Sequence, residues 1–247
     1  MSPVRSISTT ARQVARPAAR ALTRPVGTVR AVRTARPDIV LTYDDGPDPE
    51  GTPAVLDALA RSGATATFFV LTRRARLHTG LLAEVAAAGH EIALHGIDHT
   101  RLTRLPLAEV RRRIRAGKAE LEDLTGTPVR WFRAPYGALL PRHWLEVRRA
   151  GMMPVAWGPT PRDWDDDSEE RLAEGVMASS GAGEIVLAHD GYAGAEDNAF
   201  DGPAPAIDRG KLASLMLEGF AQRGLTGRSL GAALEHGTVA KWAWFLK

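Results

Sequence analysis

Short apolar segments alternate with longer amphipathic ones from Asp38 onward, and this alternation limits the possible folds more than any other feature of the chain. Apolar and β-branched runs predict strands, and segments with apolar residues at helical spacing predict helices. The predicted strands are 38–43, 65–70, 91–94, 129–132, 153–157, 184–188 and 225–230. The predicted helices are 52–62, 80–89, 107–124, 141–150, 168–179 and 209–222. This order predicts an α/β fold with about seven parallel strands, a number close to the count that closes a barrel.

Residues typical of helix ends support several of these limits. Thr52 followed by Pro53 is typical of an N-cap with proline at the first helical position. Gly63, Gly89 and Gly151 each follow a predicted helix, where a glycine commonly ends it.

The two ends of the chain differ from this regular region. Residues 1–37 contain eight Arg and no acidic residue, so we predict a disordered N-terminal arm, followed by one catalytic domain over 38–247. An arm of this charge could also contact an anionic membrane or nucleic acid, or serve as a targeting peptide. The final segment, 236–247, is rich in aromatic residues and too short to span a membrane, so we expect it to pack on the body.

Composition excludes several classes of protein. The chain has no Cys, which rules out disulfides, thiolate metal sites and a cysteine nucleophile, so a metal ion would need His, Asp or Glu ligands. Outside residues 1–37 acidic residues outnumber basic ones, and no basic-aromatic platform is present, so we expect no nucleic-acid binding by the body. We find no apolar stretch typical of an export signal or a membrane span, and therefore expect a cytoplasmic location.

Polar, titratable residues follow five of the predicted strands at their carboxyl ends. They are Asp44 and Asp45 after the first strand, His95 after the third, Arg133 after the fourth, Asp163 after the fifth and His189 after the sixth. In parallel β/α architectures the active site lies at this end of the sheet. The positions therefore predict one site built from several loops.

The spacing of His95 and His99 suggests a metal site. Two His residues four apart bring both imidazoles to one side if the local backbone is helical. This spacing alone is weak evidence, and a third ligand from the adjacent Asp44 and Asp45 would complete the set. The alternative for these two carboxylates is a solvated turn, in which Asp is common.

Five motifs in this order resemble the polysaccharide deacetylase family, also called carbohydrate esterase family four. They are Thr42-Tyr43-Asp44-Asp45-Gly46-Pro47-Asp48, His95-Gly96-Ile97-Asp98-His99, Arg133-Ala134-Pro135-Tyr136, Asp163-Trp164 and Leu187-Ala188-His189. The likeness in layout extends from about residue 38 to 230, and residues 1–37 lie outside it. Two positions depart from the family pattern, since Gly96 replaces the usual Ser or Thr and Ala134 replaces a frequent Pro.

The resemblance implies a distorted (β/α) barrel of about seven parallel strands and a metal-dependent hydrolase. Asp45, His95 and His99 would bind one divalent ion, zinc or another such as cobalt. Asp44 would be the general base, oriented by Arg133, and His189 the catalytic acid, oriented by Asp163. The backbone N–H of Tyr136 would bind the oxyanion, and Trp164 and Leu187 would line a pocket for the acetyl group.

These roles imply a deacetylase that removes N-acetyl groups from an amino-sugar-containing glycan or glycoside. The first alternative is hydrolysis of another non-peptide C–N bond, such as a cyclic imide or a natural-product amide, by the same residues. The second is a binding protein that works through its Arg-rich arm.

Overall fold

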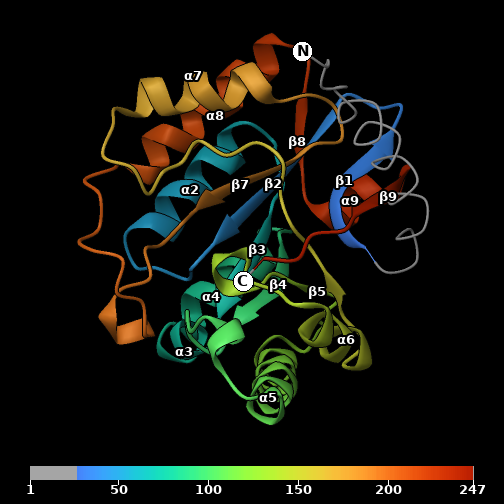
Figure 1. The fold of residues 1–247 in the computed structure, drawn as a ribbon. Helices are drawn as coiled ribbons and strands as arrows, with labels where there is room; N and C mark the ends of the chain where they lie inside the picture. Colours follow the sequence, from blue (N-terminus) through green and yellow to red (C-terminus); the bar gives the residue numbers. More distant parts are fainter. Residues whose placement is uncertain (1–26, 247) are drawn as a thin grey trace, which may run out of the picture.

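The computed structural model describes residues 27–246, whose central feature is a parallel sheet of seven strands (Figure 1). The sheet order is β6-β5-β4-β3-β2-β7, with β8 paired to β2. The strands are β2 (Asp38–Asp44), β3 (Thr67–Leu71), β4 (Glu91–Gly96), β5 (Trp131–Phe132), β6 (Met153–Pro154), β7 (Ile185–His189) and β8 (Thr226–Arg228). All seven predicted strands are present, and the α/β fold class is confirmed.

An irregular segment closes the sheet into a distorted barrel. After β6, the Gly158 N–H donates to the Ile185 carbonyl at 2.7 Å, and the Leu187 N–H donates to the Pro159 carbonyl at 3.0 Å. The residues that follow β6 therefore bond to β7, at the opposite end of the strand order. Closure leaves β7 with backbone partners on both sides, as a strand in a barrel requires.

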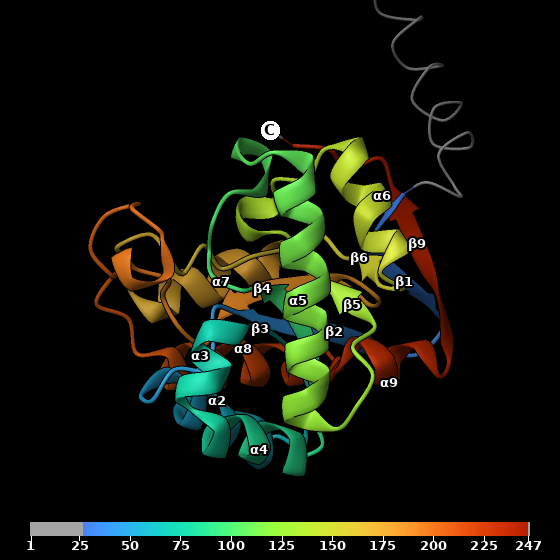
Figure 2. The same ribbon diagram turned by 90° about the horizontal axis from the view of Figure 1, so that it is seen from below.

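Helices cover the outside of the barrel (Figures 1 and 2). They are α2 (Gly51–Arg61), α3 (Thr72–Leu77), α4 (Thr79–Ala87), α5 (Leu107–Thr125), α6 (Pro141–Arg149), α7 (Glu169–Ser179), α8 (Arg209–Gln222) and α9 (Leu230–Leu234). The six predicted helices are confirmed. The short helices α3 and α9 were not predicted, because neither is long enough to show a helical period. None of the helices within residues 27–246 has the length and apolar character needed to cross a bilayer.

The predicted helix ends are only partly correct. Gly63, Gly89 and Gly151 adopt positive φ values of 58°, 80° and 82° just after their helices, as a glycine cap requires. Thr52 is not an N-cap, because the helix begins at Gly51. The Thr52 hydroxyl instead donates to Oδ2 of Asp190 at 2.5 Å, a bond that ties α2 to the loop after β7.

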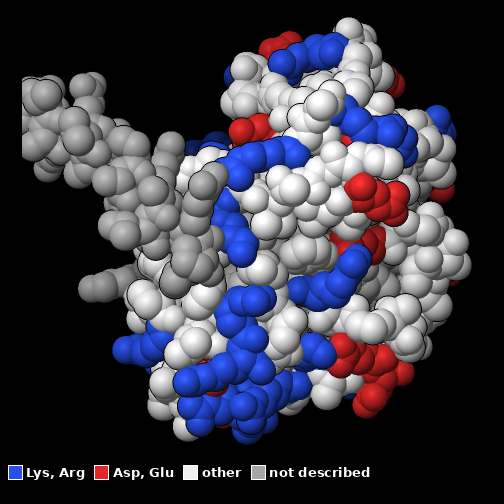
Figure 3. Space-filling view, turned by 90° about the vertical axis from the view of Figure 1, so that its right-hand side faces the viewer, with Lys and Arg blue, Asp and Glu red and all other residues white. Residues whose placement is uncertain are grey.

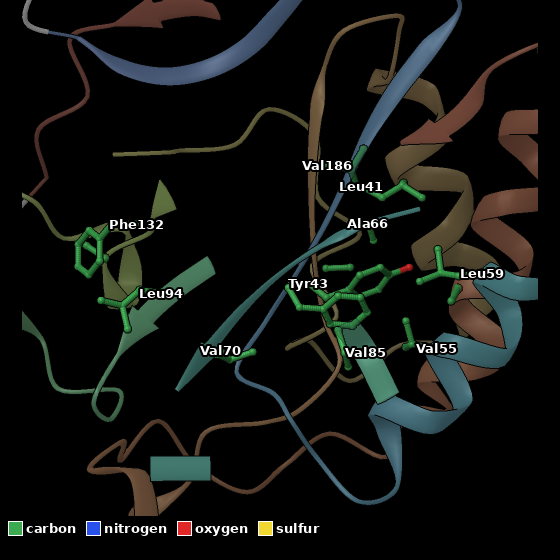
Figure 4. Packing of buried hydrophobic residues seen from close by; sticks show 14 of the residues in the cluster. Leu41, Tyr43, Val55, Leu59, Ala66, Val70, Val85, Leu94, Phe132 and Val186 are labelled. Carbon is green, nitrogen blue, oxygen red and sulfur yellow. The ribbon is translucent and has the colours of Figure 1, made fainter. Parts of the chain in front are cut away.

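The main core lies between the sheet and its helices (Figure 4). Tyr43 of β2 stacks on Phe68 of β3 with ring centroids 5.4 Å apart. Val55 and Leu59 of α2 are fully buried against this pair. Every residue of β2 is buried, which explains its nearly continuous apolar sequence. The carboxyl end of β2 therefore opens inside the molecule, and Asp44 and Asp45 are not on a solvated turn.

The prediction that residues 1–37 form a disordered arm is wrong for the described part of that segment. Residues Thr28–Thr34 form strand β1, which pairs antiparallel with β9 (Gly237–Trp242). Val29 and Val32 are buried, and the Val29 carbonyl accepts a hydrogen bond from the Ala156 N–H at 2.7 Å. The partner strand lies about 200 residues away, so no local pattern reveals it. Residues 1–26 lie outside the described part of the chain.

The expectation that 236–247 packs on the body is confirmed by β9 in the described residues of that segment. Figure 3 views the side of the molecule that carries β1 and β9, and on this side Lys and Arg cover more surface than Asp and Glu. The Arg30 guanidinium lies over the Trp242 ring, 5.2 Å from its centroid. The Arg-rich sequence around residue 30 is thus compatible with a strand in which Val29 and Val32 are buried and Arg30 and Arg33 are not.

Candidate active site

A cavity of about 380 Å³ opens at the carboxyl ends of the strands. Nine of the ten predicted site residues line it: Asp44, Asp45, His95, His99, Tyr136, Asp163, Trp164, Leu187 and His189. The tenth, Arg133, is buried next to Asp44. The structure therefore brings all ten predicted residues to one place.

Several residues that line the cavity are not among the ten predicted site residues. They are Arg101, Ala134, Gly137, Trp157, Tyr192, Ala193, Asp201 and Arg209. Trp157 is the last residue of the predicted strand 153–157, so its position could have suggested a place at this end of the barrel. Arg209 begins α8, and Asp201 lies in the long loop before it. Neither follows a strand directly, so the sequence carries no comparable indication for them.

Asp45, His95 and His99 form a three-ligand cluster. Oδ1 of Asp45 lies 3.4 Å from Nε2 of His95 and 3.6 Å from Nε2 of His99. The three candidate ligand atoms lie within 4.8 Å of one another, and no other group of this kind occurs among residues 27–246. Oδ1 of Asp45 is buried and has no hydrogen-bond partner in this part of the chain. A buried carboxylate oxygen without a donor requires a cation or a proton.

The protonation of His95 favours a cation at this point. Its Nδ1 lies 2.9 Å from the Arg133 carbonyl oxygen, and since a carbonyl can only accept, Nδ1 must donate. In the neutral ring Nε2 then presents a lone pair toward Oδ1 of Asp45. Two acceptors 3.4 Å apart repel unless a positive charge lies between them. The donor set of two imidazoles and one carboxylate fits a divalent ion and leaves coordination positions open.

Local charges match this arrangement. Burial lowers the pKa of His99 to about 4, so this imidazole is neutral at pH 7, as a metal ligand must be.

The two His residues do not share a helix, contrary to the spacing argument. His95 lies near the end of β4, and His99 lies in the irregular loop that follows. Their rings still meet, with centroids 5.3 Å apart, because the loop turns back. Gly96 is part of this turn, since a Cβ there would lie only 2.8 Å from the Asp98 carbonyl oxygen. The departure from the family pattern at residue 96 therefore matches the local backbone.

Asp44 and Arg133 form a buried ion pair beside this cluster. Nη1 of Arg133 donates to Oδ1 of Asp44 at 2.6 Å and to the Thr42 hydroxyl at 2.9 Å. Nη2 of Arg133 donates to the Ala156 carbonyl at 3.2 Å. Both side chains of the pair are almost fully buried, so each charge depends on the other. The pair fixes one oxygen of Asp44, a residue that also lines the cavity.

His189 and Asp163 form a second ion pair that lines the same cavity. Nδ1 of His189 lies 2.8 Å from Oδ1 of Asp163, and Nη1 of Arg209 donates to Oδ2 of Asp163 at 3.2 Å. Burial lowers the pKa of His189, but the charge of Asp163 and its hydrogen bond outweigh burial and raise that pKa to about 9. The edge of the Trp164 ring contacts the imidazole, with centroids 5.6 Å apart. His189 is therefore a protonated group at neutral pH.

Tyr136 lies against the metal cluster. Its ring centroid is 4.3 Å from that of His99, and the Arg101 guanidinium lies over the Tyr136 ring, 4.1 Å from its centroid. Its φ of 60° is in the left-handed region, which is uncommon for a residue with a side chain. Such strained backbone occurs often at functional sites, where it orients a backbone group.

Comparison with known proteins identifies the family. A family model described as polysaccharide deacetylase matches residues 31–155. The chain belongs to the polysaccharide deacetylase family. The match begins at Ala31, inside β1 and seven residues before the predicted start of the catalytic domain at Asp38.

Named relatives are similar in sequence to this chain over most of their own length. A chitooligosaccharide deacetylase of Azorhizobium caulinodans is 35% identical over 167 residues, which cover 67% of this chain and 80% of that protein. A peptidoglycan-N-acetylglucosamine deacetylase of Bacillus cereus is 35% identical over 155 residues, covering 62% of this chain and 72% of that protein.

Solved structures of the family share the fold. A peptidoglycan N-acetylglucosamine deacetylase superposes with a TM-score of 0.72 at 25% identity, covering 83% of this chain and 91% of that one. A family 4 carbohydrate esterase from Streptomyces lividans, solved with acetate, superposes with a TM-score of 0.69 at 24% identity, covering 83% and 98%. The distorted barrel is therefore the common architecture.

Proposed function

We propose that this protein is a metal-dependent hydrolase that removes N-acetyl groups from an amino-sugar glycan. The observation that carries the proposal is the composition of one cavity, in which the Asp45, His95 and His99 cluster lies beside a buried carboxylate, with the His189 imidazolium in the same cavity. Curated relatives named chitooligosaccharide and peptidoglycan deacetylases support this class of substrate.

Asp45, His95 and His99 would hold the metal ion. A divalent cation lowers the pKa of water from about 15.7 toward 7 and polarises a carbonyl group. We propose zinc, because two imidazoles and one carboxylate with open positions are typical of catalytic zinc sites. Cobalt and other divalent ions accept similar ligands, so exchange experiments are needed to assign the ion.

Asp44 and His189 divide the proton transfers between them. Asp44, whose Oδ1 accepts a hydrogen bond from Arg133, would accept a proton from the attacking water. His189 is protonated at neutral pH and would give a proton to the leaving amine nitrogen. Because Asp163 binds Nδ1, the Nε2 atom remains as the donor toward substrate. Amide hydrolysis needs both steps, since an amine leaves only as the protonated group.

The remaining predicted residues would bind the acyl group. The backbone N–H of Tyr136 would stabilise the oxyanion, the role to which its left-handed backbone conformation is suited. Trp164 and Leu187 would line the space for the acetyl methyl group, since both border the cavity.

Hydrolysis of another C–N bond in a small molecule is a weaker proposal. The same residues could attack a cyclic imide or a natural-product amide, but the curated relatives are named for sugar substrates. The cytoplasmic location, and a contact between the Arg-rich N-terminal residues and an anionic surface, stay predictions from the sequence alone.

Acetate release measures the proposed reaction directly. We expect the protein to deacetylate N-acetylated chitooligosaccharides or peptidoglycan fragments, EDTA to abolish the reaction, and added zinc or cobalt to restore it. His99→Ala should be inactive. His236→Ala, at an exposed position outside the five motifs, should be fully active. Turnover of non-sugar amides without any reaction on N-acetyl sugars would favour the other C–N substrates instead.

A further inference from the structure

Arg74 is a buried cation outside the predicted site residues. It lies in α3, and its side chain contacts two separate segments of the chain, the loop after β2 and the loop after β7. Its Nε donates to Oδ2 of Asp197 at 2.8 Å, and its Nη2 donates to the Tyr192 carbonyl at 2.7 Å. Its Nη1 lies 3.4 Å from Oδ2 of Asp48. An arginine buried to this degree requires such a complete set of partners.

Asp197 connects this cation to a proposed metal ligand. It ends the short turn Ala195–Asp197 in the loop after β7, and it is 1% exposed. While its carboxylate binds Arg74, its backbone carbonyl accepts the His99 N–H at 2.8 Å. The next residue, Asn198, donates through Nδ2 to Oδ2 of Asp98 at 2.8 Å. The loop that carries His99 is therefore held by the segment that Arg74 holds.

Arg74 also lies against the segment that carries Asp45. A Cβ on Gly191 would be 2.8 Å from Nη1 of Arg74 and 3.1 Å from the Asp45 carbonyl oxygen, so Gly191 is enclosed between the two. The start of α3 adds backbone bonds on both sides. Leu71 N–H donates to the Gly46 carbonyl at 3.0 Å, and Arg73 N–H donates to the Ile97 carbonyl at 3.0 Å.

We infer that Arg74 and Asp197 are positioning residues that set the separation of Asp45 and His99. The inference rests on the proposed metal site. Both ligands lie beyond the last residues of their strands, where ladder hydrogen bonds have stopped, so their relative position depends on loop contacts. Among the described side chains, only Arg74 contacts both Asp48, in the segment that carries Asp45, and Asp197, whose carbonyl binds the His99 N–H. Partners behind metal ligands typically contribute 10–100-fold in metal affinity.

The test uses three variants, Arg74→Met, Asp197→Asn and the double variant that carries both changes. Glu146→Gln is the control. Glu146 of α6 is equally buried and pairs with Arg111 of α5 at 2.8 Å, away from the cavity, so E146Q perturbs a buried carboxylate without touching the site. Zinc affinity, the visible spectrum of the cobalt-loaded protein and urea unfolding are measured for each full-length variant.

We expect R74M and D197N each to weaken zinc binding about 10-fold or more and to change the cobalt spectrum. The double variant should bind zinc no more weakly than R74M, because both changes break the same Arg74–Asp197 ion pair. R74K, which keeps the charge, should recover part of the affinity. E146Q should lose stability and keep zinc affinity within about 2-fold.

Unchanged zinc affinity and cobalt spectra in R74M and D197N, with a loss of stability like that of E146Q, would overturn the inference. D197N preserves the shape of the side chain and carries the test if R74M does not fold. A wild-type protein that binds zinc but releases no acetate from any sugar would contradict the proposed function and leave this comparison intact. A wild-type protein that binds no divalent ion would overturn both.

Discussion

The carboxylate of Asp163 binds His189 twice, through Nδ1 at 2.8 Å and through the backbone N–H at 2.7 Å. The two bonds fix both the tautomer and the orientation of the ring. Burial lowers the pKa of His189, but the charge of Asp163 and its bond to the ring raise that pKa to about 9. Asp163 thus determines which nitrogen of His189 faces the cavity and up to which pH the imidazole stays protonated.

The pH dependence of the reaction should reflect this pair. Because the pKa of His189 is raised to about 9, the imidazole is protonated below that pH, and kcat/KM should fall as pH rises through about 9. Asp163→Asn should move this alkaline limb toward about 6.5, the ordinary value for His. The measurement is kcat/KM against pH for both proteins. Asp167→Asn, in the exposed loop before α7, is the control and should keep the wild-type profile. An alkaline limb that stays in place in D163N would contradict the assigned role.

Asp44→Asn and Asp45→Asn should separate catalysis from metal binding. Asp44 pairs with Arg133, so D44N should keep the zinc-dependent rise in melting temperature and lose about 10²–10⁴-fold in kcat. Asp45 belongs to the ligand cluster, so D45N should lose the zinc-dependent rise itself. At 100 times Kd that rise corresponds to about 2.7 kcal/mol. Thermal melts with and without zinc, beside acetate release, give both readouts. If both variants change the zinc-dependent rise and kcat alike, the assignment of Asp44 to catalysis and Asp45 to metal binding is contradicted.

Adjacent hydroxyls on β2 should respond in opposite directions. The Tyr43 hydroxyl is buried without a partner in the described part of the chain, so Tyr43→Phe should leave stability unchanged or raise it by about 1 kcal/mol. The Thr42 hydroxyl donates to the Val186 carbonyl at 2.6 Å and accepts from Arg133, so Thr42→Val should cost about 1–3 kcal/mol. Urea unfolding measures both changes. A clear loss of stability in Y43F would show that its hydroxyl has a partner.

Two N-terminal deletions should show that strand β1 stabilises the fold and that the residues before it do not. Deleting residues 1–36 removes β1 and with it the buried Val29 and Val32. Burying each such side chain contributes about 1.5–3 kcal/mol, so this deletion should cost at least about 3 kcal/mol. Deleting residues 1–26 keeps β1 and serves as the matched control, with stability and kcat close to those of the full chain. Unfolding in urea and acetate release are the measurements. Equal stability of the two deletions would show that β1 contributes little.

Local sequence patterns predicted the strands and the polar residues at their carboxyl ends, because both depend on short-range information, whereas the resemblance to the family supplied Tyr136, Trp164 and Leu187. A parallel strand buried on both sides needs an apolar run, and β2 has one. Residues at strand ends converge because all strands of a closed parallel sheet point the same way, which is how Asp44, His95 and His189 came to one cavity.

Only the tertiary structure decided which distant segments complete that framework. Thr28 pairs with Trp242, Gly158 bonds to Ile185, and Arg74 binds Asp197 across more than 120 residues of sequence. Each of these contacts joins chain segments that carry no mark of one another, since an arginine in a basic stretch looks the same whether it is solvated or buried. Their energy comes from burial and from hydrogen bonds that exist only after the chain has folded. The sequence by itself therefore determined the strands and the chemistry at their ends, and the folded chain determined how the loops hold that chemistry in place.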